Sequence, residues 1–149
     1  MWRMKHILLV MAMVALVGCG ESKEEKAAKA KAIAEAKAAG KAEEQSLIVE
    51  QAIREQLEKP TGELTEADLG KVTKLKLNST RITDSGLKEV TKLKQLKELY
   101  LVSTKITDEG LKEVAQLKQL RSLDLSFTKS TPAGVAELQK ALPKCRIER

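Results

Sequence analysis

Paired leucines recur at a fixed interval in the C-terminal half of the chain and predict a stack of short strands. Each pair has the pattern LxL and lies 24 residues after the pair before it: Leu75 and Leu77, Leu99 and Leu101, and Leu123 and Leu125. Successive side chains of a strand point to opposite faces, so both leucines of a pair face one side of the sheet. Self-similarity at a fixed period indicates a repeated structural unit. We therefore expect parallel strands, one per repeat, stacked over a shared aliphatic core.

A second apolar pattern follows each strand and predicts a helix. Apolar residues recur there at intervals of three, which places them on one side of a helix. They are Leu87, Val90 and Leu93 in the first repeat, and Leu111, Val114 and Leu117 in the second. We expect each helix to pack this apolar side against the leucines of the strands.

The third repeat indicates where each helix begins. Pro132 stands where the first two repeats have Asp84 and Asp108. Proline is favoured at the first helical position, so the residue before it, Thr131, is the expected N-cap. The two aspartates then fall in the positive first turn of their helices. This placement gives the Thr-Asp pairs a structural role, and we do not interpret them as a metal site or an acid–base pair.

Aligned on this period, the repeats follow the frame LxxLxLxxT, with Val72 at its first position in the first repeat. The first two repeats continue with ITDxGL, where the third reads STPAGV. They read VTKLKLNSTRITDSGLKEVTKLKQ (72–95), LKELYLVSTKITDEGLKEVAQLKQ (96–119) and LRSLDLSFTKSTPAGVAELQKA (120–141). The frame resembles a leucine-rich repeat over roughly residues 64–149. The resemblance implies an α/β solenoid with parallel strands on the concave side and helices on the convex side. Threonine replaces the usual Asn or Cys at the ninth position, so we expect the same turn with a weaker hydrogen-bond ladder.

Both ends of the repeat region carry patterns typical of caps. Residues 46–57 predict an amphipathic helix, and Thr65 with Asp68 resembles a capping box, which together give an N-terminal helical cap over residues 46–71. This segment resembles the entry segment of bacterial internalin-like repeat proteins. Residues 142–149 predict a terminal strand in which Cys145 takes the core position of Leu123. Such a closing strand suggests a complete small protein rather than a fragment.

The N-terminus has the pattern of a secretory signal peptide, residues 1–18. A short basic start precedes 11 uncharged residues, Ile7 to Val17, which rise only about 16 Å as a helix and are too short to cross a bilayer. Leu16-Val17-Gly18-Cys19 resembles the lipobox of bacterial lipoproteins. The resemblance implies cleavage between Gly18 and Cys19, acyl chains such as palmitate on Cys19, and anchoring in the bacterial cell envelope. The location is then the outer membrane or the periplasmic or cell-surface side. The alternative is an ordinary secreted protein in which Cys19 falls there by chance.

A charged segment links this expected anchor to the repeats. Residues 19–45 are rich in Ala, Lys and Glu, which are strong helix formers, so we expect a helix over residues 21–39 that weakens at Gly40. Ile33 is the only large apolar residue of residues 21–45, which is too few for a coiled coil. The segment is therefore interpreted as a semi-rigid spacer.

Composition excludes several classes of function. Without Arg3 and Lys5 of the leader, the chain has 25 basic and 21 acidic residues, and this net charge of +4 gives little support for nucleic-acid binding. The only histidine, His6, belongs to the leader, so the mature chain lacks a His-based triad or a His-containing zinc site. With Cys19 acylated, Cys145 has no disulfide partner. We expect no enzyme, no cofactor and no metal.

The exposed positions of the strands form the candidate binding surface on the concave side. They are Lys74, Lys76, Asn78, Glu98, Tyr100, Val102, Ser122, Asp124, Ser126 and Phe127. Tyr100 and Phe127 are the only aromatic residues after the leader, and aromatic residues are enriched in binding hot spots. The alternative is that Phe127 packs under the following turn and Tyr100 is an isolated surface ring.

These patterns lead to a functional expectation that rests on the resemblance, since a fold does not dictate its ligand. We expect a membrane-anchored, non-catalytic protein that binds a protein, or else a peptide or glycan. The alternative is a structural spacer of the envelope with no specific ligand. The ITDxGL phrase also resembles repeats of eukaryotic ubiquitin-ligase substrate adaptors, but the lipobox pattern argues against that cellular role.

Overall fold

A computed structural model describes residues 23–149 of the chain. The expected signal peptide, Gly18 and Cys19 lie outside these residues, so the predicted cleavage and acylation stay predictions. The chain divides into two units, residues 1–37 and 38–149. The second unit holds the repeats and is described below.

Four short strands form one parallel sheet in the order of the sequence. They are β1 (Lys74–Lys76), β2 (Glu98–Tyr100), β3 (Ser122–Asp124) and β4 (Arg146–Glu148). Leu75, Leu99 and Leu123 are register partners in the first three strands. The 24-residue period of the sequence is therefore the step from one strand to the next, which confirms the predicted parallel stack.

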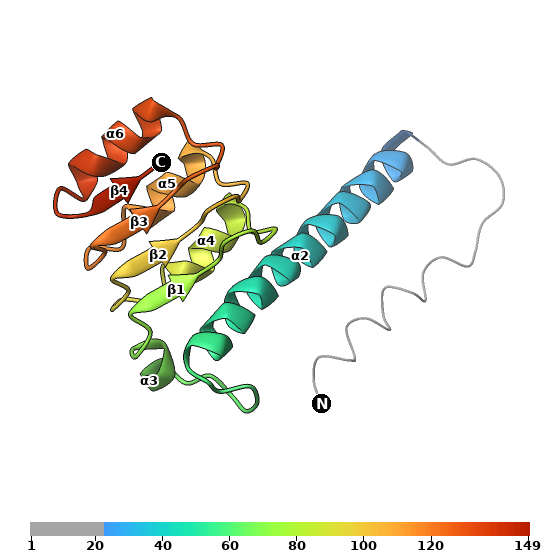
Figure 1. The fold of residues 1–149 in the computed structure, drawn as a ribbon. Helices are drawn as coiled ribbons and strands as arrows, with labels where there is room; N and C mark the ends of the chain where they lie inside the picture. The colour runs from blue at the N-terminus through green and yellow to red at the C-terminus, as the bar shows by residue number, and fades with distance from the viewer. Residues whose placement is uncertain (1–22) are drawn as a thin grey trace. The chain divides into compact units, whose positions relative to one another are not determined.

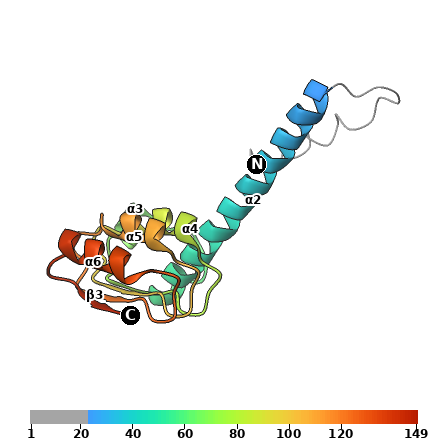
Figure 2. The same ribbon diagram turned by 90° about the horizontal axis from the view of Figure 1, so that it is seen from above.

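Three helices lie side by side along one face of this sheet (Figures 1 and 2). They are α4 (Asp84–Val90), α5 (Asp108–Val114) and α6 (Pro132–Ala141). Each begins after a threonine N-cap, and the third begins with Pro132 as expected. The chain thus alternates strand and helix, which confirms the α/β repeat architecture.

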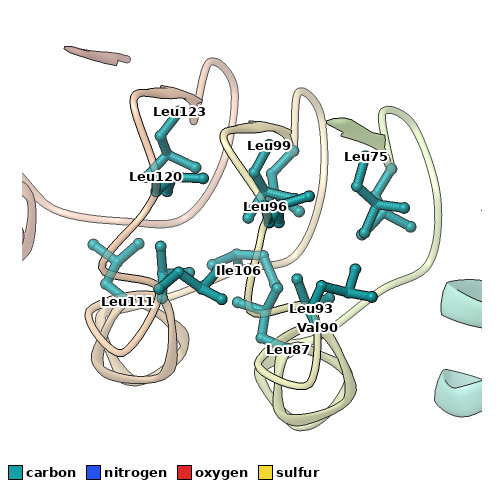
Figure 3. Close-up of a cluster of buried hydrophobic side chains, with 14 of the residues drawn as sticks. Leu75, Leu87, Val90, Leu93, Leu96, Leu99, Ile106, Leu111, Leu120 and Leu123 are labelled. Atoms are coloured by element: carbon teal, nitrogen blue, oxygen red, sulfur yellow. The ribbon is translucent and has the colours of Figure 1, made fainter. Parts of the chain in front are cut away.

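The core between the helices and the sheet is aliphatic. Leu75, Leu99 and Leu123 are fully buried, and Figure 3 shows them in a row opposite Leu87 and Leu111 of the helices. Burial of one such leucine stabilises the fold by about 1.5–3 kcal/mol. Because neighbouring repeats share this core, each repeat is stabilised by the next.

The spacer helix expected over residues 21–39 and the cap helix expected over residues 46–57 are continuous in the structure. A single helix, α2 (Lys23–Gln56), runs through Gly40. One glycine costs a helix only about 1 kcal/mol, which the surrounding helix-forming residues outweigh. Towards its end, Val49 and Ile53 join the hydrophobic core. A short helix, α3 (Glu66–Leu69), then follows, and the predicted capping box between Thr65 and Asp68 is present.

The C-terminal strand is present, but its register corrects the expectation for Cys145. Ile147 is the register partner of Leu123, and Cys145 lies just before β4. Helix α6 has ten residues where α4 has seven, and the loop after α6 is shorter by the same three residues. The 24-residue step therefore persists although the leucine spacing changes. Cys145 is still in the core at 4% exposure, and burial raises the pKa of its thiol.

Candidate functional site

The outward side of the first three strands is the candidate site, which we call the strand face. The register pairs Lys74 with Glu98 and Lys76 with Tyr100 between β1 and β2. Between β2 and β3 it pairs Glu98 with Ser122 and Tyr100 with Asp124. The strand face consists of these six residues, Lys74, Lys76, Glu98, Tyr100, Ser122 and Asp124. They form two rows of side chains because they flank the buried leucines of three adjacent strands.

Three side chains of the strand face form one cluster. The Lys74 amine lies 2.9 Å from Glu98 Oε2, and the Tyr100 hydroxyl donates a hydrogen bond of 3.0 Å to the same oxygen. The Lys74 Nζ atom also lies 5.0 Å from the centre of the Tyr100 ring. The Lys74 amine and the Tyr100 hydroxyl lower the pKa of Glu98, and Glu98 in turn raises the pKa of Lys74. The cluster fixes the orientation of the half-buried Tyr100 ring.

The other predicted site residues lie beyond the ends of the strands. The backbone ladder continues there, because Leu77 N–H donates to Tyr100 O (2.9 Å) and Ser79 N–H donates to Val102 O (2.8 Å). Asn78 uses its side-chain oxygen to accept from Val102 N–H at 3.0 Å. In the third repeat, Ser126 N–H donates to Asp124 Oδ1 at 2.9 Å.

These contacts give Asn78 and Asp124 a part in holding the turns that follow the strands. Each engaged oxygen already accepts a backbone hydrogen bond. We therefore assign Asn78 and Asp124 a structural role. The aromatic rings of Tyr100 and Phe127 are then the main candidates for contact with a partner.

Phe127 is the most exposed large apolar side chain of the described residues, at 85%. It lies in the turn after β3 and adjoins the strand face rather than forming part of it. The exposure rules out the interpretation that this ring packs under the following turn. The structure instead presents the ring to solvent.

The backbone at Phe127 is also unusual. The three equivalent turn residues Ser79, Ser103 and Phe127 have φ values of 56°, 56° and 58°. This left-handed conformation brings the Cβ atom close to the carbonyl oxygen and costs about 1–2 kcal/mol for an ordinary residue. A bulky residue there is a genuine outlier. The third repeat therefore carries an aromatic ring at a position that disfavours it.

Threonines fix the same turns in all three repeats. The hydroxyls of Thr80 and Thr104 donate to Leu77 O and Leu101 O at 2.7 Å, and Thr128 does the same to Leu125 O at 2.8 Å. This confirms that Thr at the ninth position hydrogen-bonds the turn backbone.

The aspartates of the repeats connect one repeat to the next. Asp84 accepts from the backbone N–H and the hydroxyl of Thr107, both at 2.8 Å. Asp108 accepts the same two hydrogen bonds from Thr131, both at 2.7 Å. These hydrogen bonds lower the pKa of Asp108. The sequence placed both aspartates in the first helical turn, but it missed that each one binds the N-cap of the following helix.

Gln45 begins this series of contacts in place of an aspartate. Its side-chain oxygen accepts from Thr83 N–H at 2.7 Å, and its amide donates to Arg81 O at 3.3 Å. It is a buried polar residue at 3% exposure. No repeat precedes the first one, so some other residue must take the place of an aspartate in binding Thr83. Nothing in the sequence pattern identified Gln45 as that residue.

The repeated glycine makes room for these contacts. A Cβ atom on Gly110 would collide with Asp84 Oδ1, and one on Gly134 would collide with Asp108 Oδ1. A Cβ atom on Gly86 would lie 3.0 Å from Gln45 Oε1. The 26-residue interval from each aspartate to a glycine is the sequence signal that could have revealed this packing.

The helix side of the second unit has two shallow grooves. The first, about 320 Å³, is lined by residues of α2, α3 and α4 that include Val49, Ile53 and Leu69. The second, about 400 Å³, lies between α5 and α6. Neither includes a residue of the strand face.

The described part of the chain offers neither a metal centre nor a membrane span. Residues 23–149 contain no group of three His, Cys, Asp or Glu side chains that could hold a metal ion. Within the same range, no helix is both long and apolar enough to cross a membrane.

Comparison with known proteins agrees with the repeat geometry. A family model described as "Leucine Rich repeat" matches residues 71–90 and 93–115. These residues form leucine-rich repeats. The fold is therefore a short leucine-rich-repeat solenoid with parallel strands on one side and helices on the other. Leucine-rich repeats generally mediate binding to other proteins and are typically non-enzymatic.

A solved structure of a leucine-rich-repeat protein from Leptospira interrogans is similar to this chain. The sequences are 25% identical, with a TM-score of 0.41. The match covers 58% of this chain and 28% of the Leptospira chain, so this chain spans less than a third of that protein. No curated protein matches the chain.

Proposed function

We propose that this protein binds another protein, or a peptide or glycan, through the strand face and the adjoining Phe127 turn, without catalysis. A lipid on Cys19 holds it at the membrane of a bacterial cell envelope. The observation that carries the binding proposal is the exposed Phe127 ring on a left-handed backbone.

Two physical costs at Phe127 support a binding role. The ring leaves most of its apolar surface in water, and its backbone takes a conformation that disfavours a bulky residue. The first two repeats carry serine at this position, so the turn does not require an aromatic residue. Strained residues cluster at ligand-binding sites, and a partner that covers the ring offsets the cost of its exposure.

The Tyr100 cluster suits the same role. Its ring is held by Lys74 and Glu98 before any partner arrives, so less side-chain freedom is lost on binding. The three strands of the face span only about 10 Å from first to third at a spacing of about 4.8 Å. This width fits an extended peptide or a protein loop better than a broad protein surface.

The proposed anchor rests on the sequence around Cys19. A basic start, an 11-residue apolar segment and the lipobox-like Leu16-Val17-Gly18-Cys19 occur in the order that lipoprotein processing uses. Several acyl chains on one residue anchor a protein stably, whereas a single chain gives only reversible binding.

The anchor is tested by metabolic labelling with an alkyne analogue of palmitate in a bacterial host. Wild type incorporates the label, and Cys19→Ser loses it. The variant also runs at the mass of the unprocessed chain, because cleavage depends on the acylated cysteine. Equal labelling of the two proteins contradicts the anchor.

Binding is tested by capture of partners from detergent-solubilised envelopes. The baits are wild type, Tyr100→Ala/Phe127→Ala, and a control variant, Lys88→Ala/Lys112→Ala, whose exposed lysines lie on α4 and α5. We expect the aromatic variant to lose a partner that wild type and the control retain. Identical profiles for all three baits favour the alternative function, a structural spacer with no specific ligand.

A further inference from the structure

The loops that lead from each helix into the next strand carry basic side chains and no acidic ones. The four loops are residues 70–73, 91–97, 115–121 and 142–145. Their cations are Lys71, Lys92, Lys94, Lys97, Lys118, Arg121 and Lys144, all of them exposed. These seven residues are called the basic rim below.

The repeat geometry gathers the rim along one side of the sheet. The loops join the strands at the tails of the arrows in Figure 1. Lys97 N–H donates to Thr73 O and Arg121 N–H donates to Lys97 O, both at 2.8 Å. The backbones of successive loops are therefore direct neighbours, about 4.8 Å apart. The 24-residue period relates Lys94 to Lys118 and Lys97 to Arg121, so part of the charge recurs with the leucines.

Most of these cations have no anionic partner. Lys71 pairs with Asp68 at 3.7 Å, and Lys92 pairs with Glu89. Among the described residues the other five make no ion pair. These five are Lys94, Lys97, Lys118, Arg121 and Lys144. Cations this close repel one another within the screening length of about 8 Å, and a multivalent anion would relieve that repulsion.

The opposite side of the sheet is different. There, Arg81, Lys105 and Lys129 occupy the loops from strand to helix. Asp84 and Asp108 begin the helices that follow the first two of these loops. The acidic residues on that side partly balance the charge. The opposite side thus has three loop cations against seven on the basic rim, and the excess of positive charge is greater along the rim.

The composition of the rim identifies the kind of partner. Four of its five unpaired cations are lysines, and none of the four loops contains an aromatic residue on which a nucleic-acid base could stack. None of the five unpaired cations lines either groove. Flexible lysines that line no pocket can bind a surface over which negative charge is spread, such as a layer of anionic lipid headgroups.

We propose that the basic rim binds the anionic phospholipid surface of the membrane. This inference goes beyond the acylation of Cys19, because residues of the repeats carry it. The rim adds a second, electrostatic contact to a lipid anchor, and dual signals of this kind strengthen membrane attachment. The strand face, which lies on other residues, stays available for a partner.

The test is amine labelling of the full chain in the presence of vesicles, read out residue by residue by mass spectrometry. One sample contains phosphatidylcholine vesicles and the other contains phosphatidylcholine mixed with phosphatidylglycerol. We expect Lys94, Lys97, Lys118 and Lys144 to be labelled at least about threefold more slowly with the anionic vesicles. Lys105 and Lys129 should react equally in both samples. Equal rates at the rim, or equal protection at Lys105 and Lys129, overturn the proposal.

Two matched variants sharpen the test. Lys94→Glu/Lys97→Glu/Arg121→Glu alters the rim, and Arg81→Glu/Lys105→Glu/Lys129→Glu alters the opposite loops with the same change in net charge. Lys118 and Lys144 report on both. They should lose protection in the first variant and keep it in the second, and equal loss in both would point to net charge and overturn the proposal. Circular dichroism checks folding, and the wild-type comparison decides the question even if a variant unfolds.

A separate sample with DNA tests whether the basic rim binds nucleic acid rather than lipid. A single-stranded DNA homopolymer is added in place of vesicles at the same ionic strength. DNA protection of the rim without vesicle protection contradicts lipid binding. Vesicle protection that exceeds DNA protection, and that falls as salt is raised, supports it.

Discussion

At the scale of single residues, position 127 carries a side chain that its local structure does not favour. The same turn occurs three times with left-handed φ values, and two of the three residues are serine. Phe127 gains little from burial, since its ring is 85% exposed. The sequence indicated that the ring was unusual, but it left open whether the ring was covered. The backbone conformation and the exposed fraction of Phe127 show that the ring is uncovered, and neither can be read from the periodic pattern.

Phe127→Asn should raise the free energy of unfolding by about 0.5–1 kcal/mol. Asparagine tolerates the left-handed conformation, and little apolar burial is lost. Urea denaturation measures the change. Tyr100→Asn is the comparison, and it should be destabilising because that ring is half-buried and hydrogen-bonded. A loss of stability in Phe127→Asn would mean that the ring packs against the turn and is not free to meet a partner.

At the scale of secondary-structure elements, each repeat is joined to the next by a carboxylate and a glycine. Asp84 binds the N-cap Thr107, and Gly110 leaves space for that carboxylate. The sequence predicted the N-caps and the first-turn aspartates, because both follow from local helix chemistry. It did not predict the link between repeats, because this contact joins residues 23 apart that no local rule connects.

Gly110→Ala should lower the free energy of unfolding by about 1–3 kcal/mol, the usual cost of forcing an extra methyl group into a packed site. The added Cβ atom would displace the Asp84 carboxylate from Thr107. Gly40→Ala is the control, because no atom lies within 4 Å of a Cβ atom there. Alanine favours the helix, so the control should not be destabilising. Thermal denaturation of both variants measures the difference, and equal stability would show that Gly110 is not needed for the packing.

The link between repeats should also make stability depend on pH. The hydrogen bonds from Thr131 lower the pKa of Asp108 in the folded state, so its contribution is present above the ordinary aspartate pKa of about 3.9 and is lost as the pH falls through the lowered value. The pKa of Asp68 is lowered in the same direction by the Lys59 amine and Thr65. Acid should therefore destabilise the protein below about pH 4.

The variant Asp108→Asn isolates this contribution. Its melting temperature should be lower than that of wild type at neutral pH, and the difference should shrink as the pH falls below about 4. Melting curves across the pH range, followed by circular dichroism, measure the effect. A difference that is constant with pH would show that the Asp108 charge does not stabilise the link.

At the scale of the whole molecule, the repeat pattern predicted the fold well because period, strand and helix all follow from leucine spacing. The predicted register of the last strand was wrong, because it relied on the leucine spacing. Helix α6 is longer and the loop after it is shorter, so the strands keep their 24-residue step while that spacing changes. Gly40 does not end α2, because the helix-forming residues on both sides of it outweigh the cost of one glycine. In the candidate site, the outward-facing strand positions could be predicted, because they alternate with the buried leucines. The Lys74–Glu98–Tyr100 cluster was not, because it joins residues of neighbouring strands.

The proposed function requires that the Phe127 turn meets a partner while the helix side of the repeats does not. Photocrosslinking in cells distinguishes the two surfaces, with the photoreactive residue benzoylphenylalanine placed in the full chain at position 127, or at the exposed helical position 88 as the control. Irradiation should give a discrete adduct from position 127 that is absent from position 88. The same adducts from both positions, or no adduct from position 127, would contradict binding through the Phe127 turn.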